Sequence, residues 1–241
     1  MNYIKQLYVI TPFKGNNIER LKVTIYSLKQ LKVGFNINHL VIHYNSKFEI
    51  IEKIKSIKNT KKYNLWPISI KKPGIYSAIN KGLDYLSKDH SYIVLGSGDI
   101  LKLVNNKQLN LLKEDMTLIN YELSSKNKTK LFRNKYLGMP YCHNAIIFKK
   151  NSLRYSTKYK ISSDYEYFLN YIKTEKIDLQ KSNNNINYQI KMIFESELGI
   201  SSNSIFRKNF ENLLICFNYF GLKGVLLNLI NNIFKIFLKK S

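Results

Sequence analysis

The stretch of residues 73–101 constrains the fold more than any other part of the chain, because it combines a helix, a buried strand and an acidic loop. Apolar residues recur at steps of three and four between Ile75 and Leu86, which places them on one face of a helix. Pro73 and Gly74 mark the start of this helix, and a polar segment follows its end. The pattern therefore predicts an amphipathic helix that packs on a core.

A buried strand and a carboxylate follow this helix. Residues 91–95 form a short apolar run of the kind buried in parallel sheets. Gly96 and Gly98 come directly after it and allow a sharp turn of the backbone. Asp99 is thus expected at the carboxyl end of a strand, where open α/β sheets place their ligands.

The rest of the chain continues this alternation. Strands are predicted at 6–11, 39–43 and 65–70, with helices at 18–31, capped by Asn16 or Asn17, and at 48–57. Further along, a helix is expected at 105–112, strands at 117–123 and 188–194, and a hairpin loop at 124–129. The fold class is α/β, a mixed and mostly parallel sheet flanked by helices, with one domain over 1–203 and a helical tail over 204–241.

Composition bounds the function. A chain of 241 residues that is 44% hydrophobic can bury one sizeable core. Its two cysteines lie far apart and form no disulfide framework, and no signal peptide is expected, so a cytoplasmic location is predicted. The net charge is +23, but only four of the 39 basic residues are arginine, which argues against nucleic acid as the partner. Part of the excess suits an anionic membrane surface and an anionic donor.

Two strings in the 73–101 stretch resemble the family 2 glycosyltransferases of the GT-A fold. Residues 74–82, GIYSAINKG, match seven of nine positions of the family pattern G-I-Y-D-A-M-N-K-G, and residues 97–99 match its acidic strand end. The resemblance is greatest to the branch that builds bacterial surface polysaccharides such as colanic acid, O-antigen and capsule. An ordinary α/β core would explain the periodicity but not these strings and their spacing.

Three further strings extend the resemblance. Residues 139–148 resemble the family's M-P-x-C-H-Q-A-x-F segment, and residues 161–169 its A-D-Y-D/E-x-F-L motif. Residues 195–203 resemble a loop that closes over the site, although Leu198 replaces one of its glycines. The resemblance covers about residues 7–219.

The resemblance implies transfer of a sugar from a nucleotide-diphosphate donor to a lipid-linked glycan acceptor, with inversion. It implies that Asp99 holds Mg²⁺ or Mn²⁺ and that His143 binds the metal or the diphosphate or orients the acceptor. It also implies that Asp164 is the catalytic base with Glu166 in support. The residues assigned to the donor are Thr11, Pro12, Asn45, Gly74, Asn80, Lys81, Ser97 and Gly98.

Structural explanations compete with several of these roles. Thr11 and Pro12 also read as a strand terminator, and a histidine at the start of an apolar run is often a satisfied core group. Ser162 or Ser163 can cap a helix whose first turn would then favour acidic residues. A solvated helix face explains Lys81 equally well.

The sequence also departs from the family pattern. Ser77 replaces a common aspartate, and the loop at 44–49 lacks the usual acids. These changes indicate an uncommon donor or, alternatively, a catalytically inactive scaffold in a polysaccharide assembly complex. The retention of both Asp99 and Asp164 favours an enzyme.

The tail at 222–240 is apolar but interrupted. On a helix its polar residues fall on one narrow face: Asn228, Asn231, Asn232, Lys235 and Lys239. Without an uninterrupted apolar run near twenty residues, it predicts a helix in the interface of an anionic membrane rather than a transmembrane span. The enzyme would then be peripheral on the inner face of the cytoplasmic membrane. The alternative is a helix docked on the domain or on a second subunit in a homo-oligomer.

Overall fold

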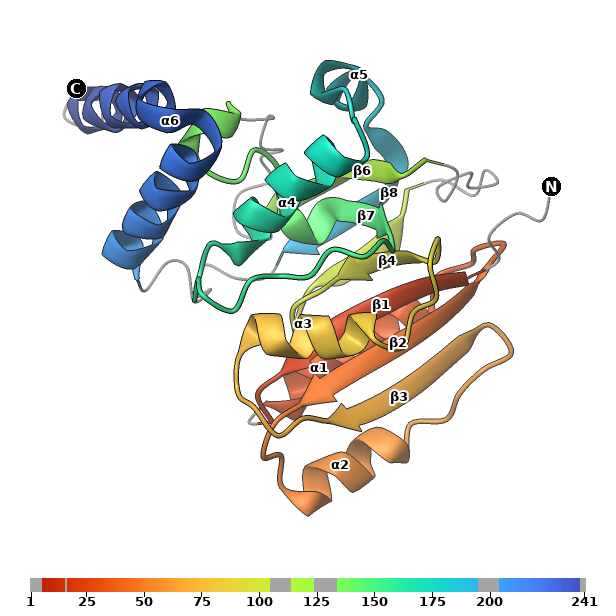
Figure 1. Cartoon of the computed structure of the whole chain (residues 1–241). Coiled ribbons are helices and arrows are strands. Elements are labelled where there is room, and N and C mark those ends of the chain that lie inside the picture. The colour runs from red at the N-terminus through yellow and green to blue at the C-terminus, as the bar shows by residue number, and fades with distance from the viewer. Residues whose placement is uncertain (1–5, 16, 105–113, 124–133, 195–203, 239–241) are drawn as a thin grey trace.

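The computed structural model describes residues 6–15, 17–104, 114–123, 134–194 and 204–238. Its strands are β1 (Gln6–Phe13), β2 (Asn36–His43), β3 (Tyr63–Ser69), β4 (Ser91–Val94), β5 (Ile100–Leu103), β6 (Met116–Leu123), β7 (Ile146–Lys149) and β8 (Asn187–Phe194). Its helices are α1 (Ile18–Lys29), α2 (Phe48–Lys55), α3 (Ile75–Leu83), α4 (Ser163–Thr174), α5 (Leu179–Asn184) and α6 (Ile205–Leu238), with short 3-10 turns η1 (Lys135–Leu137) and η2 (His143–Ala145) (Figure 1).

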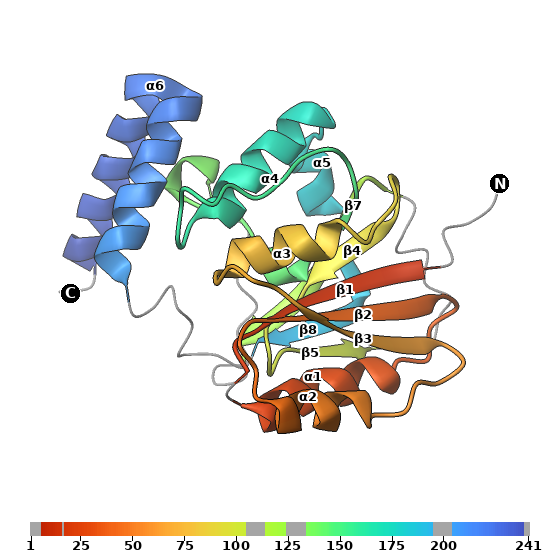
Figure 2. The ribbon, with the colours of Figure 1, turned by 60° about the horizontal axis from the view of Figure 1, so that its bottom comes forward.

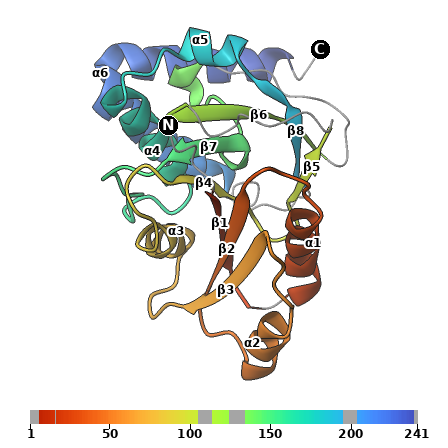
Figure 3. The same ribbon diagram turned by 90° about the vertical axis from the view of Figure 1, so that its right-hand side faces the viewer.

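The strands form one mixed sheet in the order β3-β2-β1-β4-β7-β6-β8-β5. The first four of these are parallel to one another, which confirms the predicted alternation of strand and helix. Strand β7 runs antiparallel to β4 and β6, and β5 runs antiparallel to β8. Helices α1 and α2 cover one face of the parallel half, and α3 covers the other (Figure 3).

Local sequence explains how the helices sit on the sheet. Asn17 caps α1 as expected, because its side-chain oxygen accepts the backbone N–H of Arg20 at 3.1 Å. Gly82 lets α3 approach β1 closely, since a Cβ there would lie 2.7 Å from the Cγ2 of Ile10. The absence of a side chain at Gly82 thus sets the distance between α3 and the sheet.

Several boundaries differ from the sequence prediction. Helix α3 ends at Leu83, earlier than the apolar period suggested, and β5 was not predicted because it begins immediately after the acidic loop. Helix α5, capped by Asp178, was also not predicted from the sequence. The helix predicted at 105–112, the loop at 124–129 and the closing loop at 195–203 lie outside the described residues.

The tail forms one long helix, α6, that breaks at Gly221, where φ is 62° and ψ is −158°. The two halves turn back beside one another (Figure 2), and Asn228 of the second half contacts Cys216 of the first. Within the part of the chain that the structure describes, one segment, Ile205–Ile230, is long and apolar enough to be a candidate membrane span. Because the break at Gly221 divides that span, each straight half is shorter than the roughly 20 residues that a crossing needs.

The tail packs on the domain through a few side chains of α6. Asn228 is 3% exposed and donates to the carbonyl of Tyr136 in η1 at 2.7 Å. Glu211, Asn212, Ile215 and Cys216 of the first half are also buried. Elsewhere in its described part α6 exposes large apolar side chains, namely Phe206, Phe210, Phe217, Leu222, Leu226, Leu229 and Ile230. Together they make up the apolar face of α6.

Candidate functional site

A cleft of about 640 Å³ opens at the carboxyl ends of β1, β2 and β3. Pro12 and Phe13 line it from β1, Tyr44 follows β2, and Ile70 follows β3. The start of α3 and residues 157–160 close the opposite side. Pro12 and Gly74 are the two residues of the predicted donor set that line this cleft. Its apolar and aromatic walls suit a planar ring, and Lys14 and Lys160 supply positive charge.

The loop that carries Asp99 is held by α1. The hydroxyl of Thr24 donates to the carbonyl of Gly96 at 3.1 Å and accepts the N–H of Gly98 at 2.9 Å. The carboxylate of Asp99 accepts the N–H of Gly96 at 2.7 Å and a side-chain N–H of Asn144. Asp99 is only 3% exposed. Its bond with Asn144 fixes the carboxylate beside the turn that precedes β7.

His143 lies in that turn and faces an aromatic cluster. Its Nε2 is 2.8 Å from the hydroxyl of Tyr155, and its ring contacts Phe148. Burial lowers the pKa of His143 to about 4, so the imidazole is neutral near pH 7. The side chain has the surroundings of a satisfied core group, and its role as a metal ligand stays a prediction.

Asp164 begins α4, as the sequence predicted. Its carboxylate accepts the N–H of Tyr165 at 2.9 Å and lies 3.5 Å from the hydroxyl of Tyr76. Burial raises the pKa of Asp164 to about 6, against the opposing effects of the Tyr165 N–H and the Lys208 charge. Glu166, two positions beyond, is half-buried, and burial also raises its pKa.

The expected serine cap of α4 is wrong. Ser162 stands at the N-cap position, but its side chain makes no cap hydrogen bond, and the hydroxyls of Ser162 and Ser163 have no partner among the described residues. Glu211 of α6 instead accepts the N–H of Ser162 at 2.9 Å. The carboxylate of Glu211 thus holds the backbone that leads into α4, while the N–H of Tyr165 is bonded within the first turn by Asp164.

A series of contacts links the two key carboxylates, Asp99 and Asp164. Asn144 donates to Asp99, and its neighbour His143 lies 2.8 Å from the hydroxyl of Tyr155. The ring of Tyr155 stacks on that of Tyr76, whose hydroxyl lies 3.5 Å from the carboxylate of Asp164. The fold therefore joins Asp99 and Asp164, far apart in sequence, through one set of polar and aromatic contacts, and Tyr76 also lines the cleft.

The other predicted donor residues lie elsewhere. Thr11 is fully buried, and its hydroxyl lies 2.8 Å from Nε2 of His39. Asn45 is exposed after β2 with φ of 48°, and the Lys81 ammonium lies over the ring of Tyr85 at 5.4 Å. Ser97 and Gly98 belong to the Asp99 loop, where the Ser97 hydroxyl is buried without a partner among the described residues.

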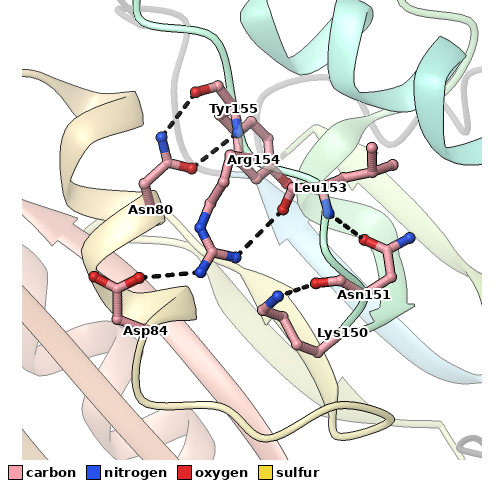
Figure 4. Close-up of polar contacts among 7 residues, drawn as sticks. All are labelled: Asn80, Asp84, Lys150, Asn151, Leu153, Arg154 and Tyr155. Carbon is pink, nitrogen blue, oxygen red and sulfur yellow. Dashed lines mark hydrogen bonds and ion pairs between the residues drawn. The ribbon is translucent and has the colours of Figure 1, made fainter.

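Asn80 fastens α3 to the loop that carries Tyr155 (Figure 4). Its side-chain NH₂ donates to the carbonyl of Tyr155 at 2.7 Å, and its side-chain oxygen accepts the N–H of Tyr155 at 2.8 Å. Nearby, Asp84 of α3 pairs with Arg154 at 3.1 Å. Asn80 thereby fixes the residue that contacts His143, which is a structural task in this arrangement.

Sequence reasoning missed four contributors, namely Thr24, Tyr76, Asn144 and Glu211. Thr24 and Glu211 carried a signal, because each is a polar residue on an apolar face of a helix and is nevertheless buried. The partners they bind come from segments about 50 to 75 positions away, which no local pattern specifies.

A divalent cation fits this site only if protein and donor share its coordination. Among the described residues no group of three or more His, Cys, Asp or Glu side chains is arranged to hold a metal. Asp99 offers one carboxylate, while Mg²⁺ and Mn²⁺ favour several oxygen ligands. The residues present thus suit a cation that obtains its remaining ligands from phosphate oxygens of a donor.

The sheet order, the flanking helices and the carboxylate after β4 define the GT-A type of α/β fold, and comparison with solved structures agrees. The S. aureus protein TarS, residues 1–349 in complex with UDP-GlcNAc, superposes with a TM-score of 0.57 at 14% identity, covering 93% of this chain and 71% of that one. The mannosyltransferase PcManGT from Pyrobaculum calidifontis, in complex with GDP-Man and Mn²⁺, gives a TM-score of 0.58 at 10% identity, covering 88% and 63%. These likenesses establish the fold. No protein-family model and no curated protein matches the chain.

Proposed function

We propose that this chain is an inverting glycosyltransferase that moves a sugar from a nucleotide-diphosphate donor to a lipid-linked glycan in bacterial surface polysaccharide synthesis. The observation that carries the proposal is the set of contacts that links Asp99 to Asp164 through His143, Tyr155 and Tyr76, the last of which lines a cleft at the carboxyl ends of parallel strands. The similar structures were solved with UDP-GlcNAc and with GDP-Man and Mn²⁺, which agrees with such a donor.

The cleft is the proposed donor site. Its walls, including Pro12, Tyr44 and Ile70, would cover the faces of a nucleoside base. Lys14 and Lys160 would attract the diphosphate. Asp99 with His143 would hold Mg²⁺ or Mn²⁺, which when bound neutralises charge on the departing diphosphate.

Asp164 is the proposed general base. A carboxyl whose pKa is about 6 is mostly ionised at pH 7 and is a better proton acceptor than an ordinary aspartate. The acceptor hydroxyl gives its proton to the Asp164 carboxylate while its oxygen forms the new bond to the anomeric carbon. The bond from that carbon to the nucleoside diphosphate breaks on the opposite face, so the configuration inverts. Glu166 would support the acceptor.

The apolar face of α6 is the proposed membrane contact. Phe206, Phe210 and Phe217 are 94%, 61% and 52% exposed, which is costly in water and favourable at a bilayer interface. With a net charge of +23, the chain would favour the anionic inner face of the cytoplasmic membrane. A lipid-linked acceptor would be met there.

One observation favours the inactive scaffold as the second candidate. Asp99 is 3% exposed and does not line the cleft, and neither Ser77 nor the loop at 44–49 supplies the acids that the family pattern places near the donor. A scaffold would keep the fold and the α6 surface without turning over a donor.

A panel of nucleotide sugars, with and without Mn²⁺, tests the proposal. We expect at least one donor to raise the melting temperature of the protein in a Mn²⁺-dependent manner and to be hydrolysed slowly, since a bound ligand stabilises the native state by mass action. Asp164→Asn is the control, which should retain the shift and lose the turnover. Binding without turnover by the wild-type protein, in the presence of membrane lipid extract, would favour the scaffold.

A further inference from the structure

Helix α6 carries a buried acidic side chain that the proposed chemistry does not use. Glu211 is 6% exposed, within a helix whose outer face is apolar. Its carboxylate accepts three consecutive backbone N–H groups, from Lys160 at 3.0 Å, Ile161 at 2.9 Å and Ser162 at 2.9 Å. Arg207, one turn earlier, donates to the same carboxylate at 3.2 Å.

Glu211 and the backbone N–H groups of Lys160, Ile161 and Ser162 form a clamp, and its bonds keep Glu211 ionised. Burial would raise the pKa of Glu211, but the three backbone N–H groups and Arg207 outweigh that effect and lower the pKa. A carboxylate held by several donors is charged and strongly bonded, so its removal would leave several backbone groups unpaired. The chain therefore keeps a charge in a buried place where an apolar residue would otherwise suit the helix.

The clamped segment serves both halves of the candidate site. Thr157, Tyr159 and Lys160 line the cleft, and Asp164 follows two positions after Ser162. On its other side, the carbonyl of Ile161 accepts the hydroxyl of Tyr76, which comes from α3. The segment is thus fixed between α3 and α6, and on the α6 side Glu211 accepts all three backbone N–H groups.

We infer that Glu211 is a positioning residue, which sets the cleft wall and holds Asp164 in its partly buried place at the start of α4. The inference rests on the proposed function for its catalytic meaning. It also gives α6 a second task, because the helix that would meet the bilayer with Phe206 and Phe210 is the helix that fixes the proposed base from its inner face.

The groups that face Asp164 come from four directions. Tyr76 approaches from α3 and Tyr165 from α4, while Tyr155 and Cys142 approach from the loops around β7. Lys208 contributes its positive charge from α6. Loss of the clamp would leave these groups in place but would admit water to the first turn of α4, and hydration favours the ionised carboxyl.

The test follows the titration of Asp164 by NMR in protein labelled with ¹³C at the aspartate carboxyls, with Asp164→Asn to assign its resonance. In the wild-type protein the pKa is expected at about 6. In Glu211→Gln it should fall toward the ordinary aspartate value, and transfer should slow by about tenfold or more. Glu211→Asp keeps the charge but moves the carboxylate away from the backbone N–H groups. It should also lower the pKa of Asp164, but by less than Glu211→Gln does.

Arg207→Gln is the matched control on the same helix. It removes the ion pair but leaves the three backbone bonds of Glu211, so the Asp164 titration should remain near that of the wild type. If Glu211→Gln does not fold, Glu211→Asp carries the test alone. An unchanged Asp164 titration in a folded Glu211 variant would overturn the inference. A shifted titration in a protein that turns over no donor would uphold the clamp and refute the proposed transferase.

Discussion

Replacement of Asn80 by alanine separates a structural role from donor binding. The two hydrogen bonds between its side chain and the backbone of Tyr155 would both be lost. Each contributes about 1 kcal/mol net, and each Tyr155 backbone group left unpaired beside the buried ring costs about 0.5–1.5 kcal/mol more. We therefore expect Asn80→Ala to lower the free energy of unfolding by about 3–5 kcal/mol.

Urea unfolding followed by circular dichroism measures this loss, with Asp84→Ala as the control. Asp84 lies one turn further along α3 and pairs with Arg154 of the same loop, but both side chains are largely exposed. Its replacement should cost at most about 1 kcal/mol. If Asn80→Ala unfolds within about 1 kcal/mol of the wild type but binds its donor more weakly, the structural role is refuted and the donor role upheld.

Three further predictions concern packing, pH and the membrane. Gly82→Ala should destabilise the protein by about 1–3 kcal/mol despite the helix propensity of alanine, because its Cβ would meet Ile10. Unfolding curves of Gly82→Ala in the wild-type and Ile10→Ala backgrounds measure the clash. An equal loss of unfolding free energy in both backgrounds would contradict the clash. Folding raises the pKa of Asp164 to about 6, so the native state binds more protons than the unfolded state between about pH 4 and 6. The stability of the wild type relative to Asp164→Asn should therefore fall as pH rises through this window and stay lower above it. Unfolding of both proteins at pH 4.5 and 7.5 checks the sign, and a rise of this relative stability with pH would disprove the prediction. Phe206→Ser with Phe217→Ser should reduce sedimentation with vesicles containing anionic lipid by about tenfold, whereas Phe48→Ser, which is 74% exposed on α2, should not; equal binding by both variants would exclude α6 as the membrane contact.

The parallel half of the fold could be predicted because its signals are local. The period of the apolar residues in α3 and the buried run of β4 each specify an element within ten residues. The position of Asp99 after β4 followed from the same pattern, and the fold comparison agrees with the architecture it implied.

The antiparallel half and the clamp could not be predicted because they depend on long-range pairing. Strand β5 pairs with β8, almost ninety positions later, and only the folded chain brings them together. Likewise, Glu211 holds the backbone at the start of α4 from another helix, while the local serines that the sequence favoured leave their hydroxyls unpartnered among the described residues. Asn80, assigned to the donor by its place in a motif, holds a backbone loop, and its donor role stays a prediction.

Donor binding and sugar transfer by three proteins, the wild type, Asp99→Asn and Asp164→Asn, test the central claim most directly. The measurement is the Mn²⁺ dependence of donor affinity by calorimetry, together with the rate of transfer. Asp99→Asn should lose the Mn²⁺-dependent part of donor binding, because one carboxylate ligand is gone. Asp164→Asn should bind donor as the wild type does and transfer sugar about 10²–10⁴ times more slowly. Wild-type transfer by Asp164→Asn, or an unchanged Mn²⁺ response in Asp99→Asn, would contradict the account.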